Sequence, residues 1–173
     1  MTNLTCPIRG ELRADYFAAD RMTVSEEARR IDCINFLLSK NYPRTHFQCE
    51  TTIIKNIGHQ GRNSLRADIT IYDIPATRVQ SSDATNHIIL VAEIKRESKA
   101  REGAIRHQLE PALRQIDRPT VYGVYWDDIH RNLYIKETID NTVRINQDSL
   151  GNIPQYMHLY RYQPLRWDSL IEP

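Results

Sequence analysis

The chain has 173 residues, of which 40% are hydrophobic and 26% charged, and its formal net charge is +1. These proportions are those of a globular protein, and they exclude global disorder and a fibrous repeat. A near-neutral charge also does not indicate nucleic-acid binding in the way that a strongly basic domain would. The length suits one compact core, so we expect a single domain over residues 1–173.

The cysteines and the apolar runs indicate in which cellular compartment the chain is expected. The three cysteines, Cys6, Cys33 and Cys49, are odd in number and lack a CxxC spacing, which argues against a disulfide framework or a zinc knuckle. A reducing, cytoplasmic setting fits best. Residues 1–20 contain no apolar signal-peptide core, and the longest apolar run has only the length of a strand. We therefore expect neither a signal peptide nor a membrane span.

The first strong helix signal covers residues 25–40, after a short helix that we expect at 14–19. Ser25 is a favourable N-cap, and an apolar stripe follows it, formed by Ile31, Ile34, Leu37 and Leu38. Glu26 and Glu27 stand in the first turn, where carboxylates complement the helix dipole. Glu27 lies on the stripe and Glu26 near its edge. These glutamates either only stabilise the helix dipole or also take part in a functional site, and the sequence leaves both interpretations open.

Three strands are predicted next, at residues 47–57, 65–72 and 88–95, with a polar turn at 58–64 and a polar loop at 75–86 between them. Short connections between consecutive strands favour a meander of neighbours in one sheet. Side chains alternate along a strand, so Asp68 shares a face with Arg66 in the middle strand. If the second and third strands pair, Asp68 approaches Glu93.

After the third strand the hydrophobic period becomes helical, with Ile105, Leu109, Leu113 and Ile116 on one face. Pro111 must kink or divide this helix. Gln108 lies at the margin of the apolar stripe, from which it can reach back to the sheet.

The residues that follow predict further strands. An apolar strand at 121–126 completes a strand, helix and strand unit, which implies a parallel pair. Strands are also expected at 133–139 and 156–162, while 140–154 has no clear pattern. The fold class is thus α/β, with a mixed central sheet flanked by helices in the order α-β-β-β-α-β plus C-terminal strands.

The most informative pattern is at the end of the third strand. Residues 88–92 are apolar on both faces, as in a buried strand, yet Glu93, Ile94 and Lys95 follow. Glu93 and Lys95 project from the same face. Together with Asp68 they suggest a Mg²⁺ site, held by the two carboxylates and the Ile94 carbonyl, with Lys95 activating water for phosphodiester hydrolysis. The simpler alternative is an ion pair at the end of a strand.

Nearby arginines are candidates for substrate contacts. Arg62 and Arg66 accompany the Asp68 strand, and Arg96 is the second residue of a run from 95 to 118 with seven basic and four acidic residues. These arginines can contact a phosphate backbone, and ordinary solvent exposure explains them equally well.

The element order and three motifs resemble a known family. The motifs are Ser25-Glu26-Glu27-Ala28-Arg29-Arg30, Arg66-Ala67-Asp68-Ile69 and Val91-Ala92-Glu93-Ile94-Lys95-Arg96. Over residues 23–126 the chain resembles the PD-(D/E)xK nuclease superfamily, and more narrowly the N-terminal nuclease domain of type I restriction enzyme R subunits.

The resemblance implies a restriction-endonuclease-like fold and a Mg²⁺-dependent endonuclease, with Mn²⁺ as a substitute, acting on DNA. Asp68, Glu93 and Lys95 would be the metal-binding and catalytic residues. Glu26 and Glu27 compete for the acid of the first helix, and Gln108 would be the glutamine of the later helix. Such an enzyme would act as a homodimer or as a subunit of a larger restriction complex.

The sequence also departs from the family pattern. Ala67 stands where a proline usually precedes the first aspartate, and no GxxxxGK[ST] loop occurs, so we expect no ATP site. The alternative function is a catalytically inactive nucleic-acid-binding or complex-assembly module with the same fold.

Overall fold

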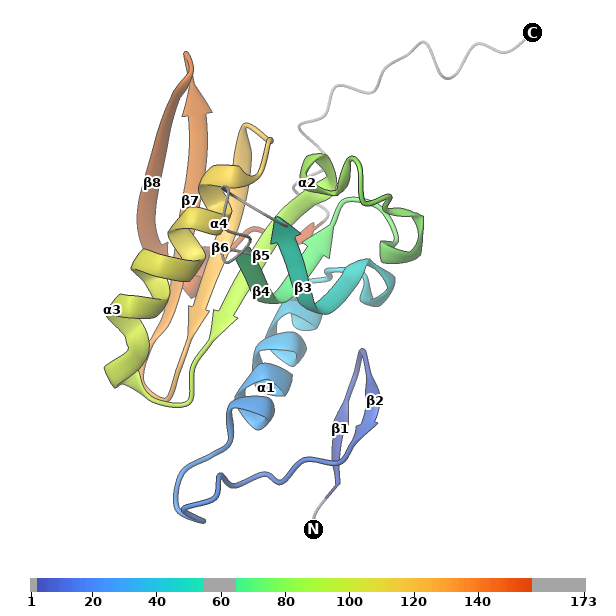
Figure 1. Cartoon of the computed structure of the whole chain (residues 1–173), viewed down its shortest axis with the longest axis vertical. Coiled ribbons are helices and arrows are strands. Elements are labelled where there is room, and N and C mark those ends of the chain that lie inside the picture. The colour runs from blue at the N-terminus through green and yellow to red at the C-terminus, as the bar shows by residue number, and fades with distance from the viewer. Residues whose placement is uncertain (1–2, 55–64, 157–173) are drawn as a thin grey trace, which may run out of the picture.

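The computed structural model describes residues 3–54 and 65–156, which form an α/β arrangement. A six-stranded mixed sheet is flanked by helices, and the chain also forms a small separate two-stranded sheet (Figure 1). The strands are β1 (Leu4–Cys6), β2 (Gly10–Leu12), β3 (Phe47–Ile54), β4 (Leu65–Tyr72), β5 (Ile88–Ile94), β6 (Thr120–Trp126), β7 (Arg131–Ile139) and β8 (Thr142–Ser149). The α-helices are α1 (Glu26–Ser39), α2 (Ala84–His87), α3 (Arg101–Ala104) and α4 (Glu110–Gln115). A π turn, Ile105–Leu109, joins α3 to α4, and 3₁₀ turns occupy Arg44–His46, Ala76–Arg78, Ser98–Ala100 and Leu150–Asn152.

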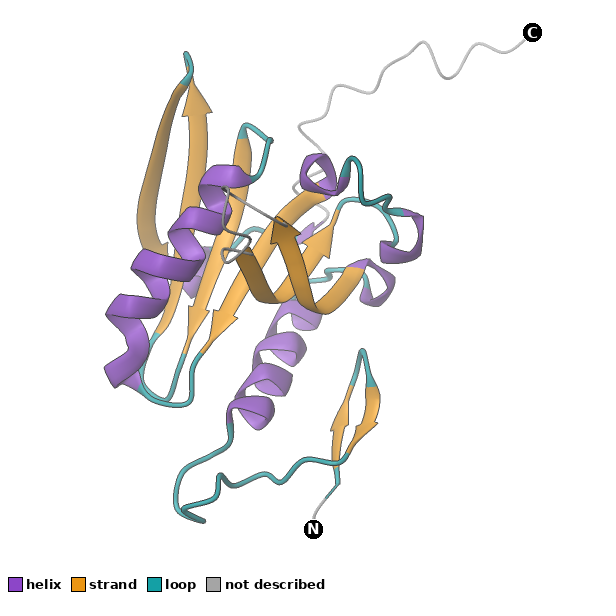
Figure 2. Cartoon of the chain, viewed as in Figure 1, coloured by secondary structure: helices purple, strands orange, loops and turns teal. Residues whose placement is uncertain are grey.

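The large sheet has the strand order β3-β4-β5-β6-β7-β8. Neighbouring strands are antiparallel except β5 and β6, which are parallel and are connected by the α3–α4 helical run (Figure 2). The predicted meander of three strands and the predicted parallel pair are therefore confirmed. β5 lies inside the sheet with every residue buried, which explains why its sequence is apolar on both faces.

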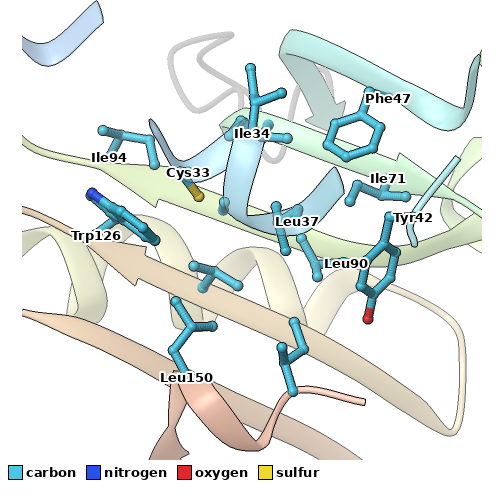
Figure 3. Packing of buried hydrophobic residues seen from close by; sticks show 14 of the residues in the cluster. Cys33, Ile34, Leu37, Tyr42, Phe47, Ile71, Leu90, Ile94, Trp126 and Leu150 are labelled. Carbon is cyan, nitrogen blue, oxygen red and sulfur yellow. The ribbon is translucent and has the colours of Figure 1, made fainter. Parts of the chain in front are cut away.

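Helix α1 covers one face of the sheet. The Ser25 hydroxyl accepts a hydrogen bond from the Ala28 amide at 3.2 Å, so the helix begins where its N-cap predicts. Its apolar stripe enters a core that includes strand side chains such as Ile71, Leu90 and Ile94, as Figure 3 shows. The predicted helix at 25–40 is confirmed.

The α3–α4 run covers the opposite face of the sheet. Its apolar residues, among them Leu109 and Leu113, form a second core with Val91 and Val121. Pro111 lacks the amide hydrogen that an α-helix needs at this position, and the helix changes to a π turn directly before α4. The predicted division of this helix at the proline is thus observed as a local change of helix type.

The short helix predicted at 14–19 is wrong. This segment contains no helix, and Phe17 pairs with Val24 in an isolated bridge. The Asp20 carboxylate accepts hydrogen bonds from the amides of Met22 and Thr23, at 3.0 and 2.9 Å. These local bonds fix a turn that returns the chain to Val24, and they replace the backbone bonds that a helix would need.

Other segments differ in detail from the sequence predictions. The unassigned region 140–154 contains β8, the polar loop at 75–86 contains a 3₁₀ turn and most of α2, and the β1–β2 pair was not foreseen. Tyr156 is not in a strand, and the rest of the strand predicted at 156–162 lies outside the described residues. The described helices include none that is long and apolar enough to cross a membrane.

Candidate functional site

A hollow of about 280 Å³ opens where β3, β4 and β5 approach α1 and the π turn. It brings together six of the residues that sequence patterns pointed to: Glu26, Arg66, Asp68, Glu93, Lys95 and Gln108. Arg30, Glu50 and Ala67 complete the lining. The hollow is therefore built mainly from charged groups that come from four separate segments of the chain.

The pairing of β4 with β5 places the two carboxylates side by side. Ile69 is registered with Ala92, so Asp68 and Glu93 are the next residues along the two antiparallel strands. The backbone amide of Ile94 donates to Asp68 Oδ2 at 2.7 Å, which ties the Asp68 carboxylate to the end of β5. The predicted approach of Asp68 to Glu93 is confirmed.

Glu93 is almost completely buried, with 4% of its surface exposed, and its Oε1 lies 2.6 Å from Lys95 Nζ. Burial and the nearby charge of Asp68 raise the pKa of Glu93 to about 7, although Lys95 opposes the shift. Burial alone would lower the pKa of Lys95, but the hydrogen bond and charge of Glu93 outweigh it and raise that pKa. The pair is thus an ion pair at the end of a strand, as the simpler interpretation predicted, and it also lines the hollow.

Arg30 is a further member of the site that sequence analysis did not single out. Its guanidinium binds three carboxylates, each at 3.1 Å: Nη1 contacts Glu27 and Glu50, and Nη2 contacts Asp68 Oδ1. The side chain is only 6% exposed, and its Nε has no hydrogen-bond partner. The available signal was the spacing, because Arg30 follows Glu26 by four residues and Glu27 by three on one helix.

Glu50 is the second residue that sequence analysis missed. It lies opposite Asp68 in the β3–β4 register and has φ of 55°, which is rare for a residue other than glycine. The two halves of β3 contribute to different cores. Phe47 packs in the core on the α1 face of the sheet, whereas Ile53 packs in the core on the opposite face. Side chains from α1 and from the π turn, which belong to opposite faces of the sheet, both line the hollow. A carboxylate within a strand rich in threonine and isoleucine was the only signal.

The structure separates the two glutamates of the first helix turn. Glu26 lines the hollow. Glu27 lines a different hollow, of about 750 Å³, next to residues 14–21, and is paired with Arg9 and Arg30. Glu27 therefore contributes through Arg30, and Glu26 is the glutamate with direct access to Asp68 and Glu93.

The remaining candidates are placed less centrally. Arg96 pairs with Glu97 at 2.6 Å and is not among the residues that line the hollow. The Ile94 side chain is buried in the α1 core, and its amide, described above, serves Asp68. Arg62 lies outside the described residues.

Comparisons with known proteins found no match. No protein-family model, curated protein or solved structure matches the chain.

The donor atoms of the hollow suit a hard divalent cation, because they are carboxylate oxygens. Burial is the main cause of the raised Glu93 pKa and the Asp68 charge the second, and a cation between the two carboxylates would relieve this second contribution. In the described part of the chain, however, no group of three or more acidic, histidine or cysteine side chains is arranged to hold a metal ion. Both Asp68 oxygens are also engaged, one by Arg30 and one by the Ile94 amide. A metal ion at Asp68 would have to compete with the Arg30 contact.

Proposed function

We propose that the chain is a Mg²⁺-dependent endonuclease that hydrolyses DNA phosphodiester bonds, with a restriction-endonuclease-like fold of the PD-(D/E)xK type. The observation that carries the proposal is the convergence of Asp68, Glu93 and Lys95 on one hollow, beside Glu26 and Gln108. Carboxylates next to a lysine are the groups that metal-assisted phosphodiester hydrolysis needs.

The order of elements supports the same proposal. Helix α1 precedes the β3-β4-β5 meander, and the α3–α4 run leads to β6, which is parallel to β5. This is the order on which the resemblance to the nuclease superfamily rests. It delivers an acid from α1 and an amide from the π turn to the carboxylates of the central strands.

Each residue has a distinct role in the proposed reaction. Asp68, Glu93 and the Ile94 carbonyl would hold Mg²⁺, or Mn²⁺ in its place. The ion would supply charge stabilisation at the phosphate and a bound water with a lowered pKa. Lys95 is held by Glu93, so its ammonium group is positioned to orient the attacking water and to stabilise negative charge that develops on the phosphate. Glu26 and Gln108 line the same hollow and can hydrogen-bond water or phosphate oxygens, and Arg66 offers a phosphate contact.

The test is cleavage of supercoiled plasmid and of linear DNA with Mg²⁺ or Mn²⁺. Lys95→Ala should lower the rate by about 100-fold or more, because a positioned charge at the reacting phosphate is lost. Lys99→Ala is the matched control, since Lys99 is 78% exposed and pairs only with Glu97 among the ion pairs of the described residues. Equal cleavage by the wild-type protein and Lys95→Ala, or cleavage by neither, would contradict the proposal.

One observation favours a second candidate, a nucleic-acid-binding or complex-assembly module that does not cut. The site carboxylates are already paired with cations of the chain, at Arg30 and Lys95. Calorimetric titration with Mg²⁺ distinguishes the two functions. Asp68→Asn should abolish metal binding in the nuclease, whereas a binding module would show no difference between this variant and the wild-type protein.

A further inference from the structure

Arg30 stands where a metal ion would compete with it. Its Nη2 lies 3.1 Å from Asp68 Oδ1, one of the oxygens that would coordinate the ion. The other Asp68 oxygen accepts the Ile94 amide. A guanidinium and a metal ion are both positively charged and repel each other when they share one carboxylate oxygen. Binding of either one at Asp68 therefore weakens binding of the other.

We propose that Arg30 is a resident cation that holds Asp68 in place without metal, must release it when a divalent ion binds, and thereby sets the metal affinity of the site. This inference rests on the proposed function, because it concerns the same metal. It names Arg30 as a positioning residue, acting through Asp68.

Arg30 can release Asp68 because other carboxylates also hold its guanidinium. Nη1 is shared by Glu27 and Glu50, each at 3.1 Å, so the guanidinium keeps two anionic partners when Nη2 leaves Asp68. Glu27 is itself bound to Arg9. The exchange therefore needs only a small movement of a group that stays paired and buried, and it leaves no isolated charge behind.

Removing Arg30 should have two opposite effects. Without metal, Arg30→Gln leaves Glu27, Glu50 and Asp68 without their shared cation, so the melting temperature should fall. With metal, the competitor for Asp68 is absent and the site is more negative, so Mn²⁺ and Mg²⁺ should bind at least about tenfold more tightly than to the wild-type protein. A purely structural role for Arg30 would lower the melting temperature without improving metal affinity.

The experiment titrates the intact metal-free protein with MnCl₂ and MgCl₂ by calorimetry, without DNA, and records melting temperatures with and without metal. Arg29→Gln is the matched control, because it removes the same charge from the neighbouring position on α1, and no ion pair of Arg29 is found among the described residues. The control should leave metal affinity within about twofold of the wild-type value.

The outcomes separate this inference from the proposed function. If the wild-type protein binds metal and Arg30→Gln binds it equally or more weakly, the role of Arg30 is refuted while the nuclease proposal stands. If neither protein binds metal, both fall. Should Arg30→Gln fail to fold, Arg30→Lys decides, because lysine keeps the charge but cannot span three carboxylates. Tighter metal binding by Arg30→Lys supports the inference, and unchanged affinity overturns it.

Discussion

Glu93 and Asp127 are buried carboxylates at the ends of neighbouring parallel strands, and their surroundings affect them in opposite ways. Ile94 is registered with Trp126, so each acid stands one residue from that pair. Both are almost inaccessible, at 4% and 0% exposure. The pKa of Glu93 is raised to about 7, whereas that of Asp127 is lowered.

The difference lies in what each carboxylate accepts. Burial alone would raise the pKa of Asp127, but hydrogen bonds from the His130 and Ile129 amides and from the Tyr125 hydroxyl outweigh it. These donors lie 2.6 to 2.8 Å away. Glu93 instead has Lys95 as its partner and Asp68 as a repelling neighbour. A carboxylate that accepts several hydrogen bonds from its own turn stabilises the fold. A buried carboxylate without such donors has a shifted pKa, which is typical of groups that take part in chemistry.

The largest effect on stability is expected at Asp127, whose carboxylate accepts several hydrogen bonds. Asp127→Ala should lower the free energy of unfolding by about 3 kcal/mol, because two amides and a tyrosine hydroxyl lose their acceptor. Urea denaturation measures the change. Asp128→Ala is the control: Asp128 accepts an exposed bond from the Ser98 amide at 2.7 Å and should cost about 1 kcal/mol or less. A smaller loss for Asp127→Ala than for Asp128→Ala would remove the structural half of the comparison.

A pH-dependent effect of about 2 kcal/mol is expected at Glu93. Its pKa is about 7 in the folded protein against an ordinary value of 4.5, so the folded state binds the proton more tightly. The resulting contribution to the free energy of unfolding is fully present below about pH 4.5 and is lost as the pH rises through 7.

Glu93→Gln carries a side chain that does not titrate. Its free energy of unfolding should therefore improve relative to the wild-type protein by about 2 kcal/mol between pH 5 and pH 8, as measured by urea denaturation at each pH. A difference that stays constant across this range would show that Glu93 is not perturbed in the way that its surroundings require.

The smallest effect tests the helix that brings Gln108 to the hollow. A Cβ at Gly123 of β6 would lie 2.8 Å from Leu113 Cδ1 and 3.3 Å from Leu109 Cδ1. Gly123→Ala should cost about 1 kcal/mol in thermal denaturation, because flexible leucine ends must shift, and should leave the Glu93 titration unchanged. Gly103→Ala is the control: nothing lies within 4 Å of its added Cβ, and alanine favours the helix, so stability should be equal or higher.

Local sequence patterns were sufficient for most of the framework. The N-cap at Ser25, the apolar stripe of α1 and the run of β5 each depend on neighbouring residues, and the structure has them where they were expected. The N-terminal segment was mispredicted because side-chain bonds from Asp20 decided its turn. Composition alone does not reveal such competition between a side chain and the backbone.

The sequence by itself determined that Glu93 and Lys95 share a face at the end of a buried strand, since alternation along a strand is a local property. Only the tertiary structure decided that Glu26 rather than Glu27 lines the hollow, and that Arg30 and Glu50 belong to the site. Arg30 meets Glu50 and Asp68 across 20 and 38 residues of chain, through a strand register and a left-handed backbone position at Glu50. Contacts of this kind depend on how distant segments pack, and no local pattern encodes them.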